Sequence, residues 1–168
     1  MKQSPDMARL EQVLRSGRIV RGGFLGTDRR PLAEIIEADR AAVTRRGLTC
    51  ERIAGRMAEL TAAAMGRLGT WVDAGGGLQV RAEEHKGLIV CPWPHPARCR
   101  KRITTARRSE TGQALQWTDL SIHLIGKHAF FQGRESAFRM EPDALIDFLG
   151  LTGEATAEDA GIWPTPKR

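Results

Sequence analysis

The sequence predicts an α+β domain, with N-terminal helices that include an αα-hairpin, a central antiparallel sheet, and C-terminal helices that pack on the sheet. Apolar residues recur at helical spacing as far as residue 68. After Gly69 the pattern changes to alternating residues and short apolar runs, which are typical of strands. Helical spacing returns after Trp117, so we expect the sheet to lie between two helical regions.

Length and composition favour a single globular unit. The chain has 168 residues, of which 41% are hydrophobic and 27% are charged, and this excludes a wholly disordered or fibrous protein. We expect one domain over residues 1–150, with a helical part at 1–68 and a part at 69–150 that holds the sheet and a zinc-finger-like region. Residues 151–168 are acidic and then proline-rich, and we expect them to form a mobile tail.

The first helix is expected to begin after Ser4, where a capping hydroxyl, Pro5 and an acidic residue follow one another. Gly17 is expected to end it. Residues 19–30 are rich in glycine and predict a short strand and a loop.

Two further helices follow. The second begins near Pro31, with Thr27 or Asp28 as its cap, and the third begins after Thr49 and keeps a helical period as far as Leu68. Because only a few residues connect them, we expect an αα-hairpin.

The sheet is predicted from five short segments. Residues 70–73 and 78–81 flank a glycine-rich turn and indicate a β-hairpin. Residues 87–90 form an apolar run that predicts a third, central strand. Residues 101–106 and 113–117 predict two more strands on either side of a turn.

Two helices are expected after the sheet. Thr118 caps the first, and Gly126 falls near its end. Pro142 begins the second, which buries Leu145 and Phe148. Together they are expected to cover one face of the sheet.

A group of thiols and imidazoles predicts a metal site. Cys91 and Cys99 bracket a rigid, proline-rich segment, and His123 and His128 lie on the helix that follows the sheet. Two thiolates and two imidazoles are a typical tetrahedral zinc set, so we predict zinc bound by these four residues. His95 is a rival ligand, because it lies between the two cysteines.

Residues 91–128 resemble a two-Cys two-His zinc finger, in which a ββα unit supplies the ligands. The two histidines have that family's four-residue gap, whereas seven residues separate the two cysteines instead of the usual two to four. The resemblance implies a structural metal with all four positions filled by protein.

Helix geometry constrains this site. Residues five apart differ by about 140° around a regular helix, so we expect the helix to widen or end at Gly126 if His123 and His128 share an ion. Two alternatives remain open. Cys91 and Cys99 are plain core residues, or they form a redox pair, although a cytosolic disulfide is rare.

A basic run follows the second of these cysteines. The chain carries a net charge of +6, and no acidic residue interrupts this run. The run predicts contact with nucleic acid or with an acidic protein, unless these residues form only a solvated strand edge. Its members are Arg98, Arg100, Lys101, Arg102, Arg107 and Arg108.

These observations favour a small cytoplasmic zinc-binding protein with a structural metal and an acidic partner. The N-terminus has no signal-peptide pattern, and no apolar run approaches the length of a membrane span. The alternative is a metal-free protein-interaction or regulatory domain. A third possibility is a metal-dependent enzyme with an open zinc position, although four protein ligands argue against catalysis.

Overall fold

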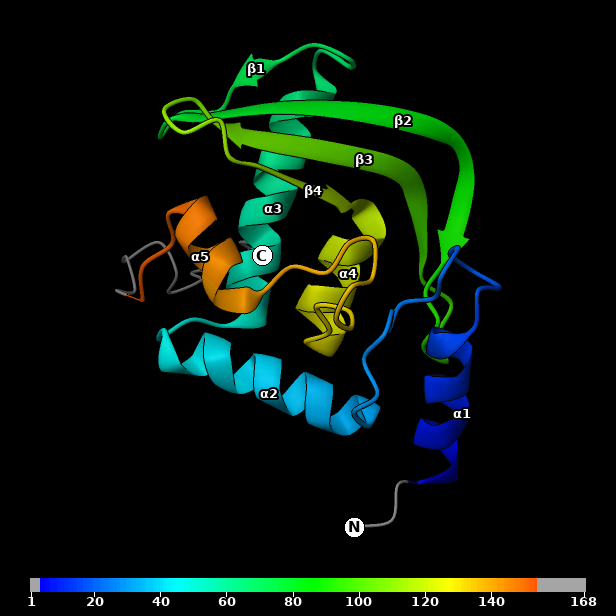
Figure 1. Cartoon of the computed structure of the whole chain (residues 1–168). Coiled ribbons are helices and arrows are strands. Elements are labelled where there is room, and N and C mark those ends of the chain that lie inside the picture. Colours follow the sequence, from blue (N-terminus) through cyan, green and yellow to red (C-terminus); the bar gives the residue numbers. More distant parts are fainter. Residues whose placement is uncertain (1–3, 154–168) are drawn as a thin grey trace, which may run out of the picture.

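The protein is an α+β fold, as the sequence predicts, with helices before and after a four-stranded antiparallel sheet (Figure 1). The computed structural model describes residues 4–153, so most of the predicted tail lies outside the described residues. The sheet order is β1-β2-β3-β4. The elements are α1 (Pro5–Arg15), α2 (Leu32–Arg45), α3 (Cys50–Met65), β1 (Val72–Asp73), β2 (Leu78–Val90), β3 (Arg98–Arg108), β4 (Ala114–Thr118), α4 (Asp119–His128) and α5 (Pro142–Leu149).

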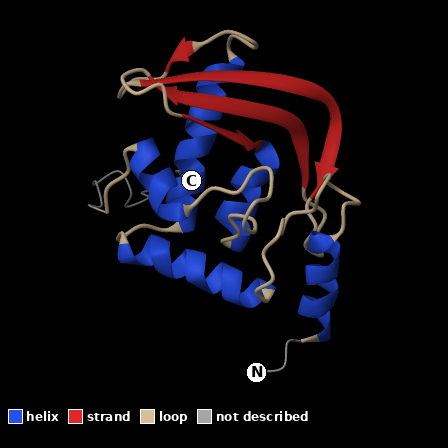
Figure 2. Cartoon of the chain, in the orientation of Figure 1, coloured by secondary structure: helices blue, strands red, loops and turns tan. Residues whose placement is uncertain are grey.

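The sheet bends over the helices. β2 and β3 form a long curved ribbon, and the helices lie on its concave side (Figure 2). The main core lies where α3 and α4 meet the sheet, and it contains Met57, Val80, Ala106, Trp117 and other apolar side chains. Burial of this apolar surface is the main force that holds the helices against the sheet.

Three predicted helix caps are present. The side chains of Ser4, Thr49 and Thr118 each accept a hydrogen bond from a backbone N–H in the first turn of the helix that follows. Each hydroxyl satisfies an N–H that the helix itself leaves without a partner.

The predicted cap of α2 is wrong. Pro31 occupies the cap position and makes no side-chain hydrogen bond to the helix. Instead, the Glu11 carboxylate of α1 accepts a 3.1 Å hydrogen bond from the Leu32 N–H. Asp28 accepts hydrogen bonds from the backbone N–H groups of Arg30 and Arg134, so it stabilises loops rather than the helix.

Residues 19–30 contain no strand, contrary to the prediction. Gly22 and Gly23 have φ angles of 83° and 72°, which interrupt any extended run. The segment instead interlocks with the loop after α4. A Cβ atom on Gly133 would lie 2.3 Å from the Leu25 carbonyl oxygen, so only glycine allows this approach.

The prediction of a separate buried strand at residues 87–90 is also wrong. These residues continue β2 and pair with β3 beyond a register shift between His85 and Leu88. Gly87, with a φ angle of 100°, provides the irregular residue. Leu88 and Val90 are 52% and 49% exposed, because β4 pairs only with the other half of β3 and the ribbon here has two strands.

Candidate metal centre

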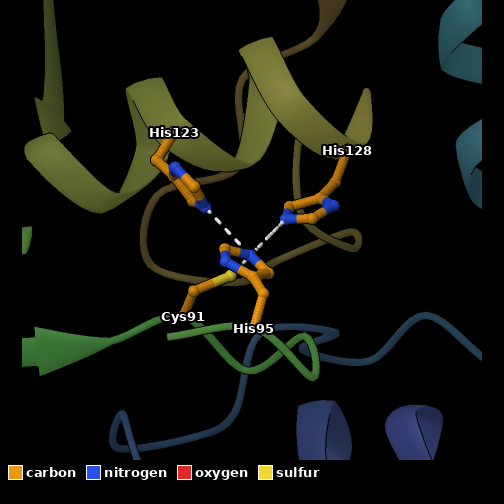
Figure 3. A group of neighbouring side chains, drawn as sticks. All are labelled: Cys91, His95, His123 and His128. Atoms are coloured by element: carbon orange, nitrogen blue, oxygen red, sulfur yellow. Dashed lines mark hydrogen bonds between the residues drawn. The ribbon is translucent and has the colours of Figure 1, made fainter. Parts of the chain in front are cut away.

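Two separate parts of the chain meet at one group of side chains (Figure 3). Cys91 directly follows β2, and His95 lies in the turn that joins β2 to β3. His123 and His128 project from α4. One ligand atom from each of these four residues lies within 4.8 Å of every other, so the group could hold a metal ion.

The turn that carries His95 is built to be stiff. Three prolines alternate with other residues between positions 92 and 96, and each fixes its φ angle and lacks an N–H. The turn is closed by hydrogen bonds from the Cys91 N–H to the Ala97 carbonyl and from the His95 N–H to the Trp93 carbonyl. A short, closed turn of this kind holds Cys91 and His95 on the same side.

Three of the six donor–donor separations are close to those of a tetrahedral zinc site, and the other three are no longer than 4.8 Å. A tetrahedral zinc ion at about 2.0–2.1 Å from nitrogen and about 2.3 Å from sulfur requires N···N edges of about 3.3 Å and S···N edges of about 3.5 Å. His95 Nε2 lies 3.0 Å from His128 Nε2 and 3.3 Å from His123 Nε2. Cys91 Sγ lies 3.5 Å from His128 Nε2.

Hydrogen bonds among these imidazoles cannot fully satisfy all three Nε2 atoms. A neutral imidazole nitrogen offers either one proton or one lone pair. Without a metal, the single proton or lone pair of His95 Nε2 must therefore be shared between His123 and His128. A cation at the centre accepts one lone pair from each donor. Metal binding therefore satisfies the four donor atoms better than hydrogen bonds between the rings do.

His95 also makes a contact that competes with ligation. Its Nδ1 atom accepts a 3.3 Å hydrogen bond from the Ala97 N–H, and this favours the tautomer whose proton lies on Nε2. Ligation through Nε2 moves that proton to Nδ1. Metal binding by His95 therefore costs the turn this long hydrogen bond.

His123 and His128 are held in the uncharged form that a metal requires. Burial, with the neighbouring His123 and His95, lowers the pKa of His128 from 6.5 to about 4. Burial, with His95 and Lys127, also lowers the pKa of His123. Burial raises the pKa of the Cys91 thiol, so a metal must displace its proton.

The predicted break in α4 at Gly126 is wrong. The helix runs without interruption to His128 and ends at Ala129, which has a φ angle of 50°. His123 and His128 reach the same place because the His95 ring lies between them (Figure 3). The His128 ring stacks on Trp93, with centroids 4.2 Å apart.

Gly126 has a packing role instead. A Cβ atom at this position would lie 2.9 Å from the Cβ atom of Ala54 in α3. The absent side chain lets α4 approach α3 closely, and this approach fixes the position of the helix that carries both histidines.

The structure brings together Cys91, His123 and His128 from the predicted ligand set, with the rival His95 as the fourth donor. Cys99 is not a member of this group. It lies in β3, where it pairs with Ile89 and packs against a buried apolar cluster. The four-residue step from Cys91 to His95 inside a proline-rich turn is the sequence signal that favours His95.

Most of the predicted basic run is occupied within the chain. Arg102 is 7% exposed and forms ion pairs with Glu84 and Asp119. Arg100 also pairs with Glu84. Contact with nucleic acid or an acidic protein stays a prediction. Fewer basic side chains of the run are free to make such a contact than the sequence suggests.

Of the other four residues of the run, two have partners within the described part of the chain and two do not. Arg107 stacks over Trp71 and donates to the Gln79 side chain. Arg108 donates to the carbonyl oxygens of Gly76 and Phe148. Among residues 4–153, Arg98 and Lys101 are exposed and have no side-chain partner.

Comparisons of the chain with protein-family models, with curated proteins and with solved structures find no match. None of the helices in residues 4–153 is both long and apolar enough to cross a membrane.

Proposed function

We propose that this protein binds one zinc ion through Cys91, His95, His123 and His128, and that the ion has a structural role. The single observation that carries the proposal is the convergence of one sulfur and three nitrogen atoms within 4.8 Å of one another, with three of their six separations near the edge lengths of a zinc tetrahedron. Four protein donors leave no position for water, which is typical of a structural site.

The donor types support zinc over Mg²⁺ and Ca²⁺. No carboxylate belongs to the group, whereas Mg²⁺ and Ca²⁺ require oxygen ligands. One thiolate and three imidazoles suit zinc, and also its spectroscopic substitute Co²⁺.

The position of the site explains what the metal would do. Cys91 and His128 are 37 residues apart in the chain, and the ion would join the β2–β3 turn to the C-terminal end of α4. If zinc binds the folded chain and not the unfolded chain, it raises the free energy of unfolding. The increase grows with the logarithm of the ratio of the zinc concentration to the dissociation constant. This end of the ribbon already packs on a buried apolar cluster through Cys91 and Trp93, and the ion would add a link to α4.

Metal analysis and thermal unfolding test the proposal. We expect the purified protein to contain about one zinc ion per chain and to unfold at lower temperature after chelation. His123→Ala should weaken zinc binding by more than about 100-fold, the upper end of the effect of losing a group that only supports a ligand. His85→Ala is the matched control, because His85 is exposed and lies outside the group.

Two results would overturn the proposal. One is wild-type protein that contains no metal and whose unfolding temperature does not change when zinc is added. The other is equal zinc binding by the His123→Ala and His85→Ala variants.

A second candidate function is a metal-dependent enzyme with three ligands. The hydrogen bond from the Ala97 N–H to His95 Nδ1 favours it, because the tautomer that it selects cannot ligate through Nε2. Cys91, His123 and His128 would then hold the ion, and water would take the fourth position. His95→Ala separates the two functions: zinc affinity falls sharply if His95 is a ligand, and it changes little if His95 only faces a bound water.

A further inference from the structure

A second site is lined by residues of β2, β3 and α4 and of the loops that follow α1 and α4. Figure 1 shows where these segments lie. The site is a cavity of about 380 Å³, between the ribbon and the two interlocked loops that follow α1 and α4. None of the four clustered Cys and His residues lines it. Its size falls within the range of small-molecule pockets.

The cavity has an apolar interior built from separate segments. Phe24 comes from the loop after α1, Ile89 from β2, Ile103 from β3, Leu120 from α4 and Phe138 from the loop after α4. Phe24 and Leu120 are buried, at 2% exposure each, so they form rigid walls. An apolar pocket with fixed walls favours a ligand with a hydrocarbon or aromatic part.

The charged residues that line the cavity are all basic. They are Arg21, Arg100, Lys101 and Arg102, and no aspartate or glutamate lines it among the described residues. Arg100 and Arg102 are paired with carboxylates that lie outside the lining.

Two of these cations remain available to a ligand. Arg21 and Lys101 are exposed and have no side-chain partner within residues 4–153. They come from segments far apart in the sequence, yet they line the same cavity. A ligand that satisfies both parts of the site has an apolar body and one anionic end.

We propose that this cavity binds a free medium-chain carboxylate, with its hydrocarbon chain among Phe24, Ile103 and Phe138 and its carboxylate between Arg21 and Lys101. The binding is reversible and involves no covalent step. The proposal does not depend on a bound metal, because it uses none of the cluster residues.

Titration calorimetry of the full chain with decanoate, at concentrations where decanoate is monomeric, tests the proposal. We expect one decanoate per chain, much weaker binding of decanol, which lacks the charge, and no binding of acetate, which lacks the chain. Lys101→Gln and Arg21→Gln should each weaken decanoate binding by about fivefold, the scale of an exposed ion pair. Arg98→Gln is the matched control, since Arg98 is an exposed cation of the same strand that does not line the cavity.

A second variant tests the location. Ala137 is exposed and lines the cavity, so Ala137→Trp should fill it and abolish decanoate binding without disturbing the buried core. The circular dichroism and thermal unfolding of each variant report whether it is folded. The proposal is overturned if decanol binds as tightly as decanoate, if Lys101→Gln behaves like Arg98→Gln, if folded Ala137→Trp binds normally, or if decanoate does not bind.

Discussion

Gly126→Ala offers a direct test of how closely α3 and α4 approach. The added Cβ atom would lie 2.9 Å from the Cβ atom of Ala54, whereas carbon atoms in good contact are about 3.5–4.0 Å apart. The two helices must therefore separate by several tenths of an ångström, and overpacking of this kind costs about 1–3 kcal/mol. The substitution also replaces a glycine within a helix by alanine. This replacement by itself stabilises a helix by about 1 kcal/mol.

Gly55→Ala provides the matched control. Gly55 lies next to Ala54 in α3, but a Cβ atom on Gly55 has no neighbour within 4 Å. This variant gains the same helical propensity without the close contact. We therefore expect Gly126→Ala to be less stable than Gly55→Ala by about 1–3 kcal/mol, which is the cost of the contact alone.

Urea unfolding in the presence of chelator measures this difference without a contribution from metal. A second measurement, zinc affinity, should also fall in Gly126→Ala, because a displaced α4 moves His123 and His128 together. If the two alanine variants unfold at the same urea concentration with equal slopes, the helices do not meet at Gly126 as described, and the reasoning is refuted.

Further variants test three other buried interactions. Asp39→Asn should lower the free energy of unfolding by about 1.5–3 kcal/mol, because the Arg139 guanidinium loses one of its two carboxylate partners and keeps Glu141. Asp39→Leu combined with Arg139→Met should recover much of this loss in urea unfolding. Thr61→Val should cost about 1–3 kcal/mol by removing the acceptor of the Trp117 indole N–H, whereas Thr61→Ser should cost less in the same assay. The Arg30 guanidinium holds the pKa of the Asp28 carboxyl well below its usual range, so the unfolded chain takes up a proton first as the pH falls. The stability that this carboxylate contributes is complete above about pH 4 and is lost below it; urea unfolding at pH 7 and pH 3 should show a smaller acid-induced loss for Asp28→Asn, and an equal loss would contradict the assignment.

Local signals in the sequence predicted most of the helices. Ser4, Thr49 and Thr118 cap helices as expected, because a cap and the N–H that it satisfies are only three residues apart. The glycine-rich turn between β1 and β2 was predicted for the same reason. The α+β order therefore followed from patterns that extend over a few residues.

Errors arose where distant segments decide the local structure. Gly87 suggested the boundary of a strand. Instead, β2 pairs with β3 on both sides of this residue, which lies in the register shift between His85 and Leu88. Residues 19–30 suggested a strand, but close contact with the loop after α4 holds them as turns. Arg102 suggested a free cation, because Glu84, its cross-strand neighbour, lies 18 positions away in the sequence.

The sequence by itself determined which residue types were available for a metal and which helix would present two of them. Only the tertiary structure decided that His95 joins Cys91, His123 and His128 while Cys99 lies outside the group. The physical reason is that ligands must converge within a few ångströms, and this distance depends on how a stiff turn and a helix from different parts of the chain are packed together. Periodicity and caps act along a single element, whereas the close approach of α4 to α3 and the bend of the ribbon set the distances between elements.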